Sequence, residues 1–292
     1  MRPGTIVVAL GGNAMAPPDE RPTIGNQFRH TRASLAAIVE LAGAGWCIAI
    51  VHGNGPQVGN ELARNEIASG EVEPLPLGVL VAGTAGWMGY MIQQSLQNAL
   101  AHAGVDRTVV TLIAQTLCDA DDPNLGTATK PIGHGAWRRL VPSPRPVAVV
   151  ERDTVRELVG RGHIVITCGG GGPPVRRAAA AALEGIEAVV DKDRVAAILG
   201  RDIGAQTLLI LTNVPAVYEA YGTPDQRPIP YLTLAAADAL LRGNALGSGS
   251  MRPKVEAAFA FVEQTGGEAL VTSAEAIRNG EAGTRIVPAS GS

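Results

Sequence analysis

TIVVALGGN, residues 5–13, is a run of apolar and β-branched residues that passes without a break into two glycines. A strand that is apolar at every position, rather than at alternate positions, is typical of a parallel sheet covered on both faces. The same pattern returns as IAIVHGNGPQ at residues 48–57 and as IVITCGGGGPP at residues 164–174. These three segments predict a central parallel β-sheet with three glycine loops along one of its edges.

Further strands and helices are predicted around these segments. The predicted strands are 5–10, 47–51, 107–113, 163–167, 207–211 and 269–272. Between them, apolar residues recur at helical spacing, and the clearest sets are Met88, Met91, Ile92, Leu96 and Leu100, then Val255, Phe259 and Val262, and then Leu35, Ile38, Val39 and Ala42. This alternation predicts an α/β fold: a three-layer αβα sandwich around a mainly parallel sheet of roughly eight strands. We expect one domain, 1–292, with approximate lobes at 1–184 and 185–292, and protruding loops near 123–146 and 220–230.

Composition narrows the class of protein. The chain has 292 residues, of which 46% are hydrophobic, and its net charge is −3 without a long basic run, which argues against a nucleic-acid partner. No window approaches the roughly 20 apolar residues of a spanning helix, and no signal-peptide pattern follows the N-terminus, so we expect a cytoplasmic protein without a membrane partner. Cys47, Cys118 and Cys168 form no CxxC pair, so a disulfide framework or a zinc site is not expected.

The glycine loops indicate an anion site. Ligands of open parallel sheets bind at the carboxyl ends of the strands, and glycines there let backbone N–H groups approach an anion closely. One such loop is weak evidence, because ordinary turns also need glycine, but three loops after three strands predict an anion-lined floor. None of them is a Walker A loop or a good GxGxxG fingerprint, so the positive charge of a phosphate site must come from elsewhere.

Lysine is nearly absent from the chain, and the few lysines that it has supply that charge. Of 24 Lys and Arg residues only three are lysine: Lys130, Lys192 and Lys254. Arginine replaces lysine easily on a surface, but not where a compact ammonium is required. Phosphoryl transfer needs phosphates held in line and their charge neutralised, which these lysines and Mg²⁺ carried on nucleotide phosphates would do. Asp191 and Asp193 flank Lys192 in the sequence, so we expect them to hold its ammonium in place.

The motifs that contain these residues resemble a known family. LGGNA (10–14), HGNGPQVG (52–59), GYMIQQ (89–94), TKPIG (129–133), RRLVPSPRP (138–146), GGGGPPV (169–175), EAVVDKD (187–193) and GSMRPKVEAA (249–258) together resemble carbamate kinases of the amino-acid-kinase superfamily. The resemblance implies a doubly wound α/β sandwich, commonly a homodimer. It also implies ATP-dependent phosphorylation of carbamate, or the reverse reaction, which makes ATP from ADP and carbamoyl phosphate.

The resemblance also implies roles for individual residues. It makes Lys130, Lys192 and Lys254 phosphate-contacting lysines, and Asp193 the carboxylate that orients them. It places the substrate and the transferred phosphoryl group at Gly11, Gly12, Asn13, Gly53, Asn54, Gly55, Gly170, Gly171 and Gly172. It places the nucleotide at Thr212, Asn213, Val214, Tyr218, Met251 and Lys254. The first lobe would then bind the phosphoryl acceptor and the second lobe the nucleotide.

Two departures from the family pattern concern the acceptor side. Only residues 134–137 separate TKPIG from RRLVPSPRP, where the family carries a longer lid, and Arg252 stands where the family has glycine, so its guanidinium could clash, contact phosphate or bind another anion. Two alternatives therefore stay open: a related kinase for another small carboxylate or carbamate-like acid, and a nucleotide-binding regulatory protein without turnover. Carbamate oxygen is already anionic and needs no base, so we expect a structural role for His52, and a packed thiol at Cys168.

Overall fold

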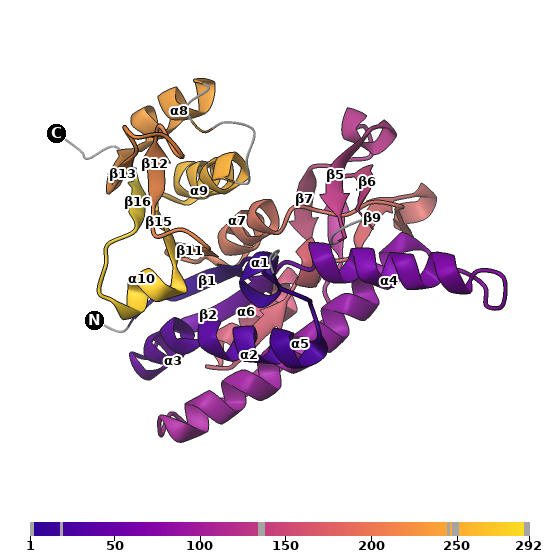
Figure 1. Ribbon diagram of the computed structural model, residues 1–292, viewed down its shortest axis with the longest axis horizontal. Coiled ribbons are helices and arrows are strands. Elements are labelled where there is room, and N and C mark those ends of the chain that lie inside the picture. Colours follow the sequence, from indigo (N-terminus) through magenta and orange to yellow (C-terminus); the bar gives the residue numbers. More distant parts are fainter. Residues whose placement is uncertain (1–2, 18–19, 134–137, 244–245, 247–250, 289–292) are drawn as a thin grey trace.

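The computed structural model describes residues 3–17, 20–133, 138–243, 246 and 251–288. Its centre is a sheet of eight strands in the order β14-β16-β15-β11-β1-β2-β8-β3 (Figure 1). Their bounds, in that order, are Tyr231–Thr233, Thr284–Val287, Glu268–Ser273, Thr207–Thr212, Thr5–Leu10, Cys47–His52, Ile164–Thr167 and Val109–Leu112. The six strands from β15 to β3 are parallel, whereas β16 is antiparallel to β15, and β14 runs with β16.

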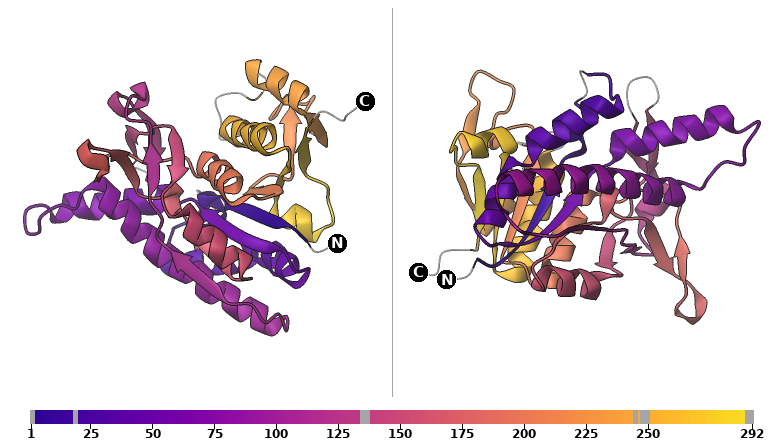
Figure 2. Two further views of the ribbon diagram at one scale, coloured as in Figure 1. Left: turned by 180° about the vertical axis from the view of Figure 1, so that it is seen from behind. Right: turned by 90° about the horizontal axis from the view of Figure 1, so that it is seen from below.

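Side chains alternate between two apolar cores, one on each face of this sheet. On β1, Ile6 and Val8 pack with the helices α3 (Ala36–Gly43) and α5 (Leu77–His102), while Val7 and Ala9 pack with the opposite layer. That layer contains α6 (Arg152–Gly160), α7 (Lys192–Ile203) and α9 (Met251–Thr265). Figure 2 shows the long α5 lying along the sheet. The predicted three-layer sandwich is therefore confirmed, and burial on both faces explains why the central strands are apolar throughout.

Smaller sheets surround the carboxyl edge of the main sheet. The strands β10 (Leu183–Gly185), β9 (Pro174–Arg177), β4 (Thr116–Cys118) and β7 (Pro146–Val149) form a sheet of their own. Two hairpins join β5 (Ala128–Ile132) to β6 (Arg139–Pro142) and β12 (Val217–Glu219) to β13 (Arg227–Ile229). The expectation of protruding loops near 123–146 and 220–230 was thus wrong in part, since both regions contain strands.

The remaining helices are α1 (Gly12–Met15), α2 (Ile24–Ser34), α4 (Gly55–Ala68), α8 (Leu234–Arg242) and α10 (Ala274–Arg278), with 3₁₀ turns at Pro123–Gly126, Gly169–Gly171 and Ala179–Ala181. Each predicted strand lies within two residues of the observed bounds. Within the residues that the structure describes, no helix has the length and apolarity needed to span a membrane.

Candidate functional site

The three glycine loops meet at the carboxyl edge of the sheet. Gly53 lies so close to Gly12 that a Cβ on Gly53 would stand 2.9 Å from the Gly12 nitrogen. In the third loop Gly170 has φ +70°, and a Cβ there would stand 2.1 Å from Nδ2 of Asn54. Only a residue without a side chain fits such contacts, and left-handed backbone favours glycine for the same reason. Loops that are more than a hundred residues apart in sequence are therefore in direct contact.

The three lysines approach this floor from three different elements. Lys192 begins α7, Lys254 lies in the first turn of α9, and Lys130 lies on β5 of the β5–β6 hairpin. In Figure 1 α7 lies between α9 and that hairpin. A cavity of about 150 Å³ separates the lysines, and its wall includes Asn54, Gly55, Lys130, Ile132, Gly170, Val190, Asp191, Lys192, Asp193 and Lys254. The predicted cationic residues therefore share one small cavity with the second and third glycine loops.

Two aspartates hold the lysines in this cavity. Asp193, only 2% exposed, accepts a hydrogen bond from Lys192 at Oδ1 and one from Lys254 at Oδ2, the latter over 3.0 Å. Asp191 pairs through Oδ2 with Lys130. The expectation that both flanking carboxylates would hold Lys192 was therefore wrong in part, because the helical turn directs Asp191 toward the hairpin instead. Three ammonium groups face two carboxylates, which leaves one positive charge available to an anion.

Burial controls the charges of this cluster. Burial lowers the pKa of Lys192, an effect that the neighbouring charge of Asp193 opposes. For Asp191, burial alone would raise the pKa, but the charges of Lys130 and Lys192 outweigh it and hold the pKa well below its usual range. Asp191 is therefore a carboxylate at neutral pH. Electrostatic interactions are strong where water is scarce, so the net positive charge of the cavity favours an anionic ligand.

Asn54 joins the second glycine loop to α5. Although Asn54 is the N-cap residue of α4, its side chain makes no capping bond, and its Nδ2 donates to Oγ1 of Thr84 over 2.8 Å. Gly55 at the start of the uncapped helix α4 lines the cavity. Free N–H groups at a helix N-terminus favour anions, so α4 adds to the positive potential of the cavity. The role of Thr84 had no signal in the sequence, because it comes from a different helix.

Of the six residues expected to bind nucleotide, Lys254 belongs to the cavity wall, whereas the other five are not among the wall residues. Thr212 ends β11, Asn213 and Val214 follow it, and Tyr218 lies on β12. Met251 begins α9, one turn before Lys254. The end of β11 adjoins the first glycine loop, since the N–H of Gly11 donates to Leu211 O over 3.2 Å. Gly11, Gly12, Gly53, Gly171 and Gly172 also lie outside the wall residues of the cavity.

Arg252 is held away from this cavity. Its Nη2 donates to the carbonyl oxygens of Leu241 at 2.7 Å and Gly243 at 2.9 Å, and its Nη1 lies 3.7 Å from Glu256. A cation that binds the last carbonyls of a helix also interacts favourably with the helix dipole. Arg252 therefore caps the C-terminus of α8, and its contact with phosphate or another anion stays a prediction. Residues 134–137, where the shortened lid was expected, lie outside the described residues.

Cys168 and His52 are both buried beneath the glycine loops. Burial raises the pKa of the Cys168 thiol to about 12, so at neutral pH the side chain is an uncharged thiol, unsuited to attack a substrate. His52 is likewise buried, its Nδ1 lies 3.2 Å from Gly53 O, and burial lowers its pKa to about 4. The imidazole is therefore neutral at pH 7, which supports a structural role.

The depressed pKa of His52 predicts a loss of stability in acid. The unfolded chain gains a proton on His52 near pH 6.5, while the folded chain resists it until about pH 4. Stability from this group is complete above pH 6.5 and is lost between pH 6.5 and 4, by about 3 kcal/mol in total. Urea unfolding of wild type and His52→Gln at pH 7.5, 5.5 and 4 measures the loss. An equal acid dependence in both proteins would show that another group is responsible.

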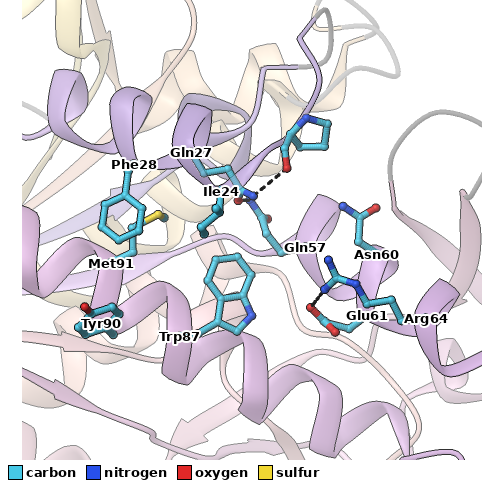
Figure 3. Close-up of a pocket in the computed structure, with 11 residues that line it drawn as sticks. Ile24, Gln27, Phe28, Gln57, Asn60, Glu61, Arg64, Trp87, Tyr90 and Met91 are labelled. Carbon is cyan, nitrogen blue, oxygen red and sulfur yellow. Dashed lines mark hydrogen bonds and ion pairs between the residues drawn. The ribbon is translucent and has the colours of Figure 1, made fainter.

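A second pocket, of about 410 Å³, lies between α2, α4 and α5, and none of the three lysines is among its lining residues (Figure 3). Trp87 and Tyr90 line it from α5, and Gln57 donates to Oε1 of Gln27 over 2.8 Å at its inner side. Met88 and Met91 are fully buried in the core beneath, as their helical spacing predicted. The chemistry expected of the lysines therefore does not extend to this pocket.

Comparison with known proteins places the chain in a family. The model described as the amino acid kinase family matches residues 4–273, and the chain therefore belongs to the amino acid kinase family. The carbamate kinase of Halobacterium salinarum is 40% identical over 315 residues, covering 97% of this chain and 98% of the relative. A carbamate kinase-like protein of Escherichia coli is 36% identical over 311 residues, covering 97% of this chain and 98% of the relative.

A solved structure agrees with these relatives. Carbamate kinase from Giardia lamblia bound to AMP-PNP superimposes with a TM-score of 0.90 at 34% identity, over 97% of this chain and 98% of that one. Within its family the chain therefore belongs with the carbamate kinases, and the predicted resemblance is confirmed. The alignment of 315 residues with the Halobacterium protein exceeds the 292 residues of this chain, so that relative has residues which this chain lacks.

Proposed function

We propose that this protein catalyses reversible phosphoryl transfer between ATP and carbamate, so that ADP and carbamoyl phosphate give ATP and carbamate. The observation that carries the proposal is the joint cluster of Lys192, Asp193 and Lys254, with Lys130 opposite, at the meeting point of the glycine loops. Membership of the carbamate kinases supplies the two substrates. The polar side chains of Lys130, Lys192, Asp193 and Lys254 converge on this cavity, which can hold a phosphoryl group.

The proposed chemistry needs charge and alignment more than a base. The acceptor oxygen of carbamate is an anion, so no residue has to remove a proton before attack. Lys192 and Lys254, fixed by Asp193, would neutralise charge on the transferred phosphoryl group, while Lys130 approaches from the opposite wall. The backbone at Gly11, Gly12, Gly53 and Gly170–Gly172 would line the path between donor and acceptor oxygens, together with Asn13 and Asn54.

The nucleotide is proposed to lie over the end of β11. Thr212, Asn213, Val214, Tyr218 and Met251 would contact its base and ribose, which leaves its phosphates to reach Lys254. The four strands β14, β16, β15 and β11 all come from residues after 185, which supports a nucleotide-binding lobe at 185–292 and an acceptor lobe at 1–184. Among the residues that the structure describes, no group of three or more His, Cys, Asp or Glu could hold a metal ion. Mg²⁺ would accordingly arrive with the nucleotide, bound to its phosphates.

Purified protein with ADP and carbamoyl phosphate tests the proposal, with ATP formation as the measurement. A panel of other acyl phosphates belongs in the same experiment, because a relative of comparable identity is a carbamate kinase-like protein and this chain is shorter than its relatives. Turnover of another acyl phosphate without turnover of carbamoyl phosphate would favour a kinase for a different small acid. Tight binding of ATP without any turnover would favour a regulatory protein.

We also propose a homodimer formed through α5 and the edge strand β3. β3 is an edge strand of the main sheet. The unpaired backbone groups of an edge strand can associate with another chain. Tyr90 on α5 and Ile113 after β3 are exposed, and Gly86 brings the helix close to Ile113, since a Cβ there would lie 3.7 Å from its Cδ1. Light scattering should give twice the chain mass for wild type and a single mass for Ile113→Asp with Tyr90→Glu. A monomeric wild type at micromolar concentration would contradict the proposal.

A further inference from the structure

Lys130 reaches the cavity from an element that is not part of the main sheet. The β5–β6 hairpin is held at the end of β5, where Gly133 N–H donates to Gly55 O over 2.9 Å and Ile132 packs with Val58 and Val141 in a separate apolar cluster. The Lys130 side chain is 37% exposed, whereas those of Lys192 and Lys254 are about 10% exposed. A long, half-exposed lysine samples many rotamers, and each must be given up when it binds a phosphate.

One short segment supplies the partner that limits this freedom. Both carboxylate oxygens of Glu187 accept the N–H of Leu77 at the start of α5, over 3.1 and 3.0 Å. Two residues on, Val189 N–H donates to Pro142 O of β6 over 3.0 Å. Residues 187–191 therefore connect α5, the hairpin and α7 in sequence, and the segment ends at Asp191.

Asp191 makes two kinds of contact with its two oxygens. Its Oδ1 caps α7, accepting the N–H of Asp193 at 2.9 Å and of Arg194 at 3.3 Å. Its Oδ2 pairs with the ammonium of Lys130. The carboxylate of Asp191 is buried and is held at the N-terminus of α7, the helix that begins with Lys192. The ion pair with Asp191 therefore fixes the position of the Lys130 ammonium relative to Lys192.

We propose that Asp191 is a positioning residue, which holds the Lys130 ammonium in register with Lys192 for phosphoryl transfer. The proposal rests on the proposed function, because it assigns the pair to the same cavity. Asp191 does not have to touch substrate. Its capping oxygen fixes the carboxylate, and the carboxylate selects the one rotamer of Lys130 that faces the transferred group. Small errors in such placement are costly, since a misplacement of about 1 Å can slow a reaction about 10²-fold.

A double-mutant cycle on this pair tests the proposal. Asparagine at position 191 keeps an oxygen that can cap α7 but has no charge to hold Lys130. We expect Asp191→Asn to lower kcat for ATP formation by about 10- to 100-fold, with kcat compared under conditions in which urea unfolding shows the variant to be folded. In Lys130→Met the residue to be positioned is already absent, so adding Asp191→Asn should change kcat by less than about twofold. Asp191→Ser, which also caps a helix, replaces Asp191→Asn if the latter does not fold.

Asp122→Asn is the matched control. Asp122 is also a buried N-cap residue, accepting the N–H of Asn124 at 2.8 Å and of Arg145 at 2.6 Å, but it contacts no lysine in the described residues. Its substitution should leave kcat unchanged. The proposal would be overturned if the effects of Asp191→Asn and Lys130→Met on kcat multiplied in the double variant. It would also be overturned if kcat of Asp191→Asn equalled or exceeded that of wild type, because the ion pair would then hold Lys130 in an unproductive position.

The four proteins of the cycle, which are wild type, Asp191→Asn, Lys130→Met and the double variant, separate this proposal from the function on which it rests. Wild type that makes no ATP from carbamoyl phosphate would defeat the proposed function. The cycle can then be read from the affinity for AMP-PNP by calorimetry, where coupling between Asp191 and Lys130 is again expected and additive effects would overturn the positioning role.

Discussion

Replacing Lys192 by arginine is expected to lower kcat for ATP formation from ADP and carbamoyl phosphate by about 10²- to 10³-fold, as loss of one correctly placed hydrogen-bond donor at a developing anion does elsewhere. The ammonium of Lys192 is nearly buried and bonded to Asp193, and its stem passes over Gly53, where a Cβ would lie 3.1 Å from its Cδ. A guanidinium is larger and planar and would not fit this space in the same direction. Steady-state kinetics with both substrates saturating measures the loss.

The other two lysines should follow in the order of their burial. Lys254→Arg should approach the effect of Lys192→Arg, whereas Lys130→Arg should cost less, because the exposed end of Lys130 leaves room for a larger group. Arg201→Lys, near the other end of α7, is the control and should retain full activity. Turnover near that of wild type in all three lysine variants would remove the basis for assigning them to phosphate.

Replacing Asp193 by asparagine is expected to lower the free energy of unfolding by about 3–5 kcal/mol, as removal of one partner from a buried ion pair generally does. Asp193 is the shared partner of Lys192 and Lys254, and both ammonium groups lose their compensating charge at once. Activity should fall as well, because neither lysine keeps its orientation. Urea unfolding and steady-state kinetics on the same preparation measure the two effects.

An exposed ion pair provides the comparison for Asp193. Asp153 pairs with Arg156 on the outer side of α6, at 2.7 Å, with both side chains largely exposed. Asp153→Asn should change the free energy of unfolding by less than about 1 kcal/mol and leave kcat unchanged. If Asp193→Asn were as mild as this control, the buried cluster would contribute neither stability nor alignment.

The central sheet could be predicted from the sequence because burial on both faces leaves an unmistakable pattern. β1, β2 and β8 are apolar at almost every position, and β1 was predicted to the residue. The strands β14 and β16 and the hairpins could not be recognised in the same way. They are three to five residues long and partly exposed, and β5 and β13 contain the prolines Pro131 and Pro228, which usually argue against a strand.

The site was predictable to the level of residue types. The lysines of an arginine-rich chain identified the cations of the cavity, and of the three glycine loops the second and third contribute Asn54, Gly55 and Gly170 to its wall. The ion-pair and hydrogen-bond partners of these side chains were not predictable, because the partners come from distant elements. Asp191 pairs with Lys130 rather than with Lys192, and Arg252 donates a hydrogen bond to a carbonyl oxygen of α8. Such choices depend on the angles at which helices and hairpins leave the sheet.

The distribution of lysine has a practical consequence for labelling the molecule. Across the described residues every ion pair outside the cavity uses arginine or His30 as the cation, and the lysines pair only with Asp191 and Asp193. A reagent for primary amines therefore meets few targets on this chain. Besides the N-terminal amine, Lys130 is the most accessible of the three lysines. An acylating fluorophore, used sparingly, would report on the mouth of the cavity without any engineered cysteine.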